Sequence, residues 1–225
     1  MSIPHEFNPL GTSTAEGYVT DGLILWFDAL KEEEGERSYL TNWASGSQCV
    51  FNNNIIVRDG YITHGPDRAW FNPAPGNKID GNPHVGLGYS ADICATQGGY
   101  FSAVVWNCLK ISGDYVLGFQ VHYSNHGLRC QGGNGEMTAY PGYYYPLLAG
   151  KTYSFHLGRD TKTEMRQNGE VLNAISGNFT IGVDGYTAYL ARNIKLHAYR
   201  LYNRQLSVEE QRQNYQLDKK RFNVL

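Results

Sequence analysis

The chain has 225 residues, which fits one large domain or two small ones, and all-β sandwiches often reach this length as single domains. Its 26 glycines, 17 tyrosines and only 18% charged residues favour strands joined by turns, while 41% hydrophobic residues exclude a disordered low-complexity chain. The formal net charge is −2 and no cluster of lysine and arginine is interleaved with aromatic residues, so we expect no nucleic acid partner.

The N-terminal residues 1–20 show neither the helical nor the strand period of hydrophobic residues, so we predict an N-terminal arm there. They also contain neither the basic nor the apolar region of an ordinary export signal. From Asp21 the pattern becomes strand-like, because Leu23–Phe27 is an apolar run typical of an interior strand and too short for membrane insertion. The glutamate-rich run 32–36 is predicted to be a solvated loop, and residues 21–225 are predicted to form one domain.

Alternation of apolar and polar residues predicts further strands in the middle of the chain. The alternation is clearest over residues 114–123, and residues 101–106 and 152–157 show the same period. Asn168-Gly169 predicts a type I′ hairpin turn, in which both central residues need a positive φ. A last strand is predicted over residues 194–202.

One helix is predicted, at the C-terminus. Ser207 and Glu210 form the sequence pattern of a capping box, in which each side chain hydrogen-bonds the backbone of the other residue. Acidic residues follow in the first turn and basic residues gather in the last, which suits the helix dipole. Val208, Tyr215 and Phe222 recur every seven residues and predict one packing face.

Two segments near the ends of the predicted domain carry a family resemblance. Residues 21–29, DGLILWFDA, resemble the opening strand of laminin-G-like domains of the concanavalin A-like lectin/glucanase superfamily. Residues 196–210, LHAYRLYNRQLSVEE, are similar to the closing signature of these domains, and this segment is the more specific of the two. Between them, residues 101–106 look like the central strand of the family and residues 167–171 like its Asn-Gly hairpin.

The resemblance implies an all-β fold, namely a concanavalin A-like jelly-roll sandwich of two antiparallel sheets, here with a short C-terminal α-helix. Members of the superfamily bind glycans or proteins, some through calcium, and a minority are glycosidases. Residues 213–222 resemble the tails of laminin-G-like proteins from tailed bacteriophages and gut bacteria. Together with the N-terminus described above, this similarity favours a phage or prophage product.

The sequence lacks the carboxylate pattern of the superfamily's glucanases. These enzymes carry Glu-x-Asp-x-x-Glu on one strand, where the period of two aims the side chains at the same cleft. No glutamate here is followed by aspartate two positions later, and Asp160, Glu164 and Glu170 are interpreted as solvated charges around a turn. We therefore expect that the chain is not an enzyme and has no catalytic residues.

Metal binding has only scattered candidates. His122, His126 and Cys130 are metal-compatible but fall on a strand end and a loop region, so they are interpreted as unrelated polar residues. His156 and His197 lie within predicted strands and are expected to make ordinary hydrogen bonds. No cofactor is required, but the resemblance makes calcium a candidate ligand, with oxygen donors at Asn52–Asn54, Asp92, Asp114 and Asp184. The well-separated cysteines are expected to be free, mostly buried thiols: Cys49, Cys94, Cys108 and Cys130.

Aromatic side chains are the strongest binding feature of the sequence. A turn-rich segment and a second loop supply the candidates for contact with a carbohydrate or another partner: Tyr140, Tyr143, Tyr144, Tyr145, Trp70 and Phe71. Exposed rings stack on sugars or anchor protein interfaces. The alternative is that these rings cover the ends of the sandwich or fill a subunit contact.

We interpret the chain first as a non-catalytic module for carbohydrate or cell-surface recognition, on a phage virion surface as a decoration, fibre or tail protein. The alternative is a purely structural virion assembly protein that uses the sandwich for protein contacts, and the third option is a glycoside hydrolase. The expected partners are a cell-surface glycan or glycoprotein and other virion proteins, with a homo-oligomer or display in several copies. The expected location is the virion surface, assembled in the host cytoplasm, with a bacterial cell surface as the alternative.

Overall fold

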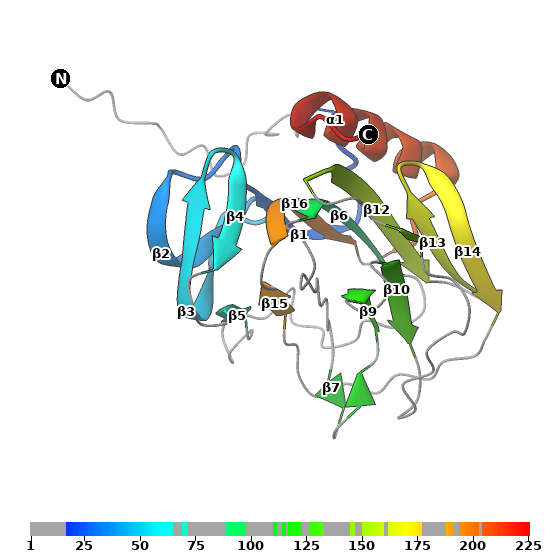
Figure 1. Cartoon of the computed structure of the whole chain (residues 1–225), viewed down its shortest axis with the longest axis horizontal. Helices are drawn as coiled ribbons and strands as arrows, with labels where there is room; N and C mark the ends of the chain where they lie inside the picture. Colours follow the sequence, from blue (N-terminus) through cyan, green and yellow to red (C-terminus); the bar gives the residue numbers. More distant parts are fainter. Residues whose placement is uncertain are drawn as a thin grey trace.

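The computed structural model describes thirteen stretches of the chain: residues 17–64, 69–71, 89–97, 110–111, 114–115, 117–122, 127–132, 145–146, 150–159, 162–176, 188–190, 194–202 and 204–225. These residues form antiparallel strands and one C-terminal helix, α1 (Val208–Phe222), which lies across one face of the sheet (Figure 1). The predicted all-β sandwich with a short C-terminal helix is confirmed. No helix among the described stretches is long and apolar enough to cross a membrane.

The strands of the first half of the chain are β1 (Leu23–Asp28), β2 (Gly35–Asn42), β3 (Ser47–Arg58), β4 (Tyr61–His64), β5 (Ala69–Phe71), β6 (Tyr89–Gln97), β7 (Lys110–Ile111) and β8 (Asp114–Tyr115). Those of the second half are β9 (Leu117–His122), β10 (Gly127–Gly132), β11 (Tyr145–Pro146), β12 (Thr152–Arg159), β13 (Lys162–Gln167), β14 (Glu170–Ser176), β15 (Ala188–Leu190) and β16 (Ile194–Tyr202). The main sheet runs β14-β13-β12-β6-β16-β4-β3-β5-β15, with β1 also on β16 and β2 also on β3. The order β11-β10-β9 makes a smaller sheet, and β7 pairs with β8.

Strand β16 is the centre of the main sheet, since it pairs with β6 along its length and with β1 over residues 198–202. Its side chains alternate between two buried environments. Tyr199 faces the apolar interior, where the ring of Phe27 on β1 lies 6.3 Å from Tyr199 and 6.2 Å from Phe51 on β3, measured between ring centroids. Ala198 and Arg200 face the opposite side, toward α1.

The local signals of hairpin and helix are confirmed. Asn168 has φ 51° and Gly169 φ 82°, so the turn between β13 and β14 has positive φ at both central residues. Ser207 accepts a hydrogen bond from the Glu210 amide, and the Glu210 carboxylate accepts one from the Ser207 amide. The strands predicted over residues 152–157 and 194–202 correspond to β12 and β16.

The packing face of α1 differs from the prediction. Phe222 is buried, but Val208 and Tyr215 are only partly buried. The buried residues of the helix are mostly polar: Gln211, Asn214, Asp218 and Phe222. The apolar heptad did not reveal this face because the sheet surface beneath α1 is itself polar, so the helix matches it with hydrogen-bonding groups.

The start of the described chain also differs from the sequence interpretation. Tyr18 and Val19, which fall in the predicted arm, are 4% and 8% exposed and pack beneath α1. The run 32–36 is not simply a solvated loop, because β2 already begins at Gly35 and the Glu32 side chain is 2% exposed. Tyr18 and Val19 were assigned to the arm because two apolar residues are too few to show a period. Glu32 can be buried because it accepts hydrogen bonds that replace those of water.

Candidate functional site

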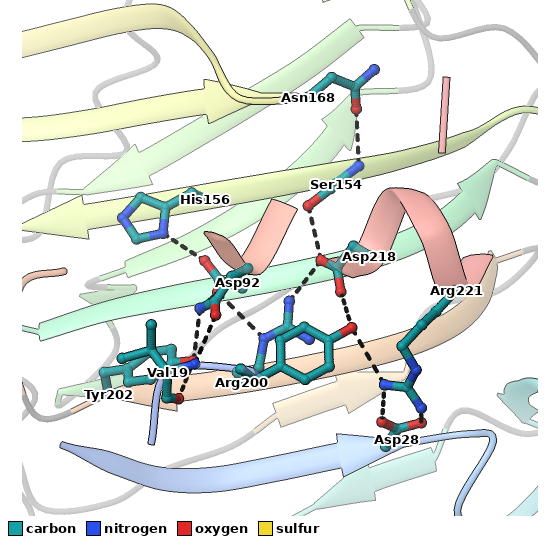
Figure 2. A network of polar contacts seen from close by, with 12 residues as sticks. Val19, Asp28, Asp92, Ser154, His156, Asn168, Arg200, Tyr202, Asp218 and Arg221 are labelled. Carbon is teal, nitrogen blue, oxygen red and sulfur yellow. Dashed lines mark hydrogen bonds and ion pairs between the residues drawn. The ribbon is translucent and has the colours of Figure 1, made fainter. Parts of the chain in front are cut away.

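A layer of polar side chains is buried between the main sheet and α1 (Figure 2). Its residues form two rows. Within each row, the residues lie opposite one another on neighbouring strands. The register places Asp92 of β6 opposite His156 of β12 on one side and Arg200 of β16 on the other. The second row consists of smaller side chains: Ser154, Cys94, Ala198 and Asp28. These small residues let Phe222 and Val224 pack closely on the sheet.

Arg200 is the positive centre of this layer and is completely buried. Its Nη2 lies 2.6 Å from the Asp218 carboxylate of α1, and its Nε lies 3.3 Å from Asp92. Burial alone would lower the pKa of Arg200, but the two carboxylates raise it well above its usual value. Arg200 is therefore a permanent charge that needs both partners in place.

Asp92 is held as a carboxylate. Burial would raise its pKa, but hydrogen bonds from His156 and Asn214 and the charge of Arg200 lower it overall. The distances are 2.6 Å from Asp92 Oδ1 to His156 Nδ1 and 2.7 Å from Asp92 Oδ2 to Asn214 Nδ2. With its oxygens engaged by three side chains, Asp92 has a structural role, which removes one of the candidate calcium ligands.

A second ion pair connects the end of the helix to β1. Arg221 donates two hydrogen bonds to the Asp28 carboxylate, at 2.6 and 3.1 Å. Its Nη1 also donates to the Tyr18 hydroxyl, which in turn donates to Asp218 at 2.8 Å. Figure 2 shows the resulting path from Asp28 through Arg221, the Tyr18 hydroxyl and Asp218 to Arg200. One connected network therefore joins β1, β6, β12, β16, α1 and the start of the described chain.

This network is closed to a substrate. Asp92, Arg200 and Asp218 are at most 3% exposed, so no sugar or peptide can reach their charges without moving α1. Arg200 Nη1 and His156 Nε2 are buried and have no hydrogen-bond partner among the described residues, and a water molecule would satisfy either group. The arrangement can hold the helix on the sheet, but it does not present a nucleophile or an acid and base to a cleft.

Three of the six aromatic residues singled out from the sequence lie within the described stretches. Trp70 and Phe71 belong to β5, where they pair with Tyr189 and Ala188 of β15, rather than to the loop that we expected. Tyr145 begins β11 and pairs with Leu128. Tyr140, Tyr143 and Tyr144 lie outside the described residues, as does the predicted strand 101–106. The binding role of all six aromatic residues stays a prediction.

The histidines and cysteines behave largely as expected where they are described. His156 bonds Asp92, and His197 bonds Thr96 and the Gly60 carbonyl, so both are ordinary hydrogen-bonded sheet residues. Cys49 and Cys94 are free and buried, and burial raises the pKa of Cys49 to about 12. Within the described stretches no group of three histidine, cysteine or acidic residues could hold a metal ion.

The fold is similar to that of solved structures, although neither a protein-family model nor a curated protein sequence matches this chain. Trypanosoma rangeli sialidase in complex with sialic acid matches with a TM-score of 0.66 and 16% identity over 86% of this chain and 32% of the sialidase. Botulinum neurotoxin type C, whose entry into cells depends on two ganglioside molecules, matches at 0.64 with 11% identity over 92% and 53% of the two chains. The binding domain of botulinum neurotoxin DC, in complex with rat synaptotagmin II, matches at 0.62 with 9% identity over 88% and 52%.

At these identities the similarity shows the shared β-sandwich fold, and this chain spans only about a third of the sialidases. The neighbours nevertheless overturn our main functional interpretation of a non-catalytic recognition module on a phage virion. Among the matched structures are sialidases, which are glycoside hydrolases and correspond to the third option, and a neurotoxin binding domain. Their range of partners agrees with glycans or proteins in general.

Proposed function

We propose that this chain takes part in glycoside hydrolysis, as a β-sandwich that contacts the glycoside in a sialidase-like protein. The observation that carries the proposal is the match to Trypanosoma rangeli sialidase over 86% of this chain with a TM-score of 0.66. Sialic acid is the ligand in that structure, so a sialoside is the substrate class to test first.

The buried charges are consistent with a contact role for this chain rather than a hydrolytic centre beneath α1. Asp28, Asp92 and Asp218 are each bound by an arginine inside the fold. Most glycosidases use two carboxyl groups that flank the scissile bond, and sialidases use a tyrosine nucleophile, so a carboxylate held by a buried arginine suits neither arrangement. The expectation that the isolated chain is not an enzyme stays a prediction, and the following assay tests it.

The test combines a cleavage assay with a binding assay on the full chain. The purified protein is mixed with a fluorogenic sialoside, and contact with a methyl sialoside is followed by saturation-transfer NMR, with and without calcium. Saturation transfer without cleavage supports a contact role. Fluorophore release would show that the chain itself is catalytic, so the no-enzyme prediction would be wrong. If the chain shows neither activity, the proposed function is wrong.

A variant pair extends this test to the aromatic residues predicted from the sequence. Replacing Tyr143, Tyr144 and Tyr145 together by alanine should abolish sialoside contact if these rings bind the sugar. Val171→Ala is the control, because it shortens a side chain that is 49% exposed on β14. Equal contact in both variants would remove the tyrosines from the site.

The finer family assignment belongs to the same proposal. We infer a laminin-G-like, concanavalin A-like sandwich, because the two segments that carry that resemblance form β1 and the junction of β16 with α1. Calcium binding and a homo-oligomer stay predictions. Calcium dependence of the saturation transfer and light scattering of the full chain would test them.

A further inference from the structure

The tip of the hairpin between β13 and β14 carries a pair of residues with a chemistry of its own. Asn168 and Gly169 are both partly exposed to solvent. In an Asn-Gly pair the backbone nitrogen of the glycine can attack the side-chain amide of the asparagine, because glycine has no Cβ to hinder the approach. Asparagine is a chemically labile residue, and the structure around this pair decides how fast it reacts.

Two hydrogen bonds hold Asn168 against strand β12. Its backbone amide donates to the Ser154 carbonyl at 2.8 Å, and its side-chain Oδ1 accepts from the Ser154 amide at 3.0 Å. The side-chain amide is thus fixed by its oxygen to a neighbouring strand. Ring closure onto Gly169 requires this amide to rotate, which breaks the hydrogen bond to Oδ1. The closed hairpin therefore protects Asn168 from the reaction.

Contacts with α1 help to keep the hairpin closed. The ring of Tyr215 lies against Gly169, where its Cδ1 would be 2.9 Å from an added Cβ. Ser154, which binds Asn168, also donates from its Oγ to Asp218 of α1 at 3.0 Å. Figure 2 shows the resulting line of contacts from Asn168 through Ser154 to Asp218. The tip therefore opens only when it leaves both β12 and the helix.

Opening the tip is a smaller event than unfolding the sheet. The ladder between β13 and β14 ends at the pair formed by Gln167 and Glu170, so only the two residues between them need to move. Local openings of partly exposed turns have free energies well below that of global unfolding. The reaction can hence proceed in the folded protein at a reduced rate.

We propose that Asn168 is a site of spontaneous deamidation, and that the opening of the hairpin tip sets its rate. The Gly169 nitrogen loses its proton to hydroxide and attacks Asn168 Cγ. The bond from Cγ to Nδ2 then breaks, and the nitrogen takes up a proton and leaves as ammonia. A five-membered succinimide ring remains. Water adds to either of the two ring carbonyls and opens the ring to aspartate or isoaspartate, so the reaction needs no oxidant or reductant.

The two products affect the fold differently. Aspartate keeps an oxygen at the place of Oδ1, which can still accept from the Ser154 amide. In isoaspartate the Cβ becomes part of the main chain, so the two-residue turn gains a backbone atom and no longer fits the hairpin. The contact between position 169 and Tyr215 is then lost, and the hairpin is released from α1. This inference does not depend on the proposed function.

Peptide mass spectrometry of the full chain measures the conversion at Asn168 after incubation at mildly alkaline pH, either folded or in guanidinium chloride. Conversion should occur in both, and it should be about 10–100-fold slower in the folded chain. Tyr215→Ala should speed the reaction of the folded chain several-fold and leave the rate in denaturant unchanged, because it removes a contact that only the folded chain makes.

Asp59→Asn provides the matched comparison within the same protein. It places a second Asn-Gly pair at a hairpin tip, between β3 and β4, where residues 59 and 60 have φ of 48° and 70°. Residue 59 is exposed, and its amide is bonded by the Glu34 side chain instead of a neighbouring strand. Position 59 should therefore convert faster than position 168 in the folded chain, and the two should convert at similar rates in denaturant.

Three outcomes would overturn the proposal. Equal rates at positions 59 and 168 of the folded variant, or equal rates at Asn168 in folded and denatured chain, would show that the hairpin does not control the reaction. An absence of product at Asn168 after about a hundred of its half-lives in denaturant would show that the folded protein has no such site. The unmodified chain supplies the last two measurements even if a variant fails to fold.

Thermal unfolding tests the effect of the products. The aged protein, which contains isoaspartate, should unfold at a lower temperature than Asn168→Asp, which reproduces the aspartate product alone. Equal unfolding temperatures would show that isoaspartate does not release the hairpin from α1.

Discussion

Arg200 illustrates how single residues hold this protein together, because its buried charge depends on two carboxylates. We expect Asp218→Asn to lower the free energy of unfolding by about 3–5 kcal/mol, since it leaves a buried arginine only partly compensated. Urea denaturation followed by fluorescence measures this loss. Asp21→Asn is the control: Asp21 also pairs with an arginine, but its side chain is 85% exposed, so the loss should stay below about 1 kcal/mol. Equal losses would contradict the role of the network.

The burial of His197 leads us to expect that the stability of the fold depends on pH. Its Nδ1 faces the Gly60 carbonyl, which can only accept, so Nδ1 carries the proton and Nε2 accepts from the Thr96 hydroxyl. Burial lowers the pKa of His197 below its usual value of 6.5, against the raising effect of the bond to Gly60. Below pH 6.5 the unfolded chain therefore binds more protons at this site than the folded chain, and the free energy of unfolding falls as the pH falls.

Urea denaturation at about pH 7.5 and about pH 5.5 tests this prediction. The unmodified chain should lose stability over this range, and His197→Gln should lose less. Asp92 does not affect this comparison. Its pKa is lowered from its usual value of 3.8 in the folded chain, so its contribution to stability is lost only at more acidic pH than the two tested. The same pH slope in both proteins would show that His197 is not the group responsible.

At the scale of elements, the hairpin between β13 and β14 touches α1 through one glycine. Gly169 has φ +82°, and a Cβ added there would lie 2.9 Å from Cδ1 of Tyr215. Gly150 is a matched control, with φ +76° and no atom within 4 Å of an added Cβ. Gly150→Ala should therefore cost about 1 kcal/mol from the backbone alone, and Gly169→Ala about 1–3 kcal/mol more from the clash.

Urea midpoints of both variants, and of Gly169→Ala in a Tyr215→Ala background, measure these terms. The alanine at position 215 should remove the additional loss, because it removes the ring that the new methyl group meets. If Gly169→Ala costs no more than Gly150→Ala, the hairpin does not press on the helix.

Elements with local signals could be predicted from the sequence. The apolar run Leu23–Phe27, the Asn168-Gly169 turn and the capping box at Ser207 each act within a few residues, and each is found in the structure. The polar layer under α1 could not be predicted. Asp92, His156 and Arg200 meet only because three strands pair in one register. The alternation of residues along a single strand does not tell which face of the sheet is covered by the helix.

At the scale of the whole molecule, the beginning of the described chain is fastened to its end. Val19 donates its amide to Asn214 Oδ1 at 3.0 Å, and its carbonyl accepts from the Tyr202 hydroxyl at 3.2 Å. The Tyr18 ring lies 4.3 Å from the Arg200 guanidinium and packs edge-on against Trp26. Residues 17–20 thus contribute to the same layer that holds α1 on the sheet.

Two shortened chains, one beginning at Gly17 and one at Asp21, isolate this contribution because they differ by only four residues. We expect the shorter chain to lose at least about 3 kcal/mol of unfolding free energy, since it lacks the buried Tyr18 and Val19 and leaves Asp218 and Asn214 with fewer partners. Amide hydrogen exchange should show the loss first in α1, while β1 and β16 keep each other's protection through their pairing.

A full chain carrying Tyr18→Phe, which loses only the hydroxyl bond to Asp218, should have a stability between those of the two shortened chains in the same measurements. If both shortened chains unfold at the same urea concentration and exchange α1 amides equally fast, α1 is held by the sheet alone and the fastening of the two ends is incidental.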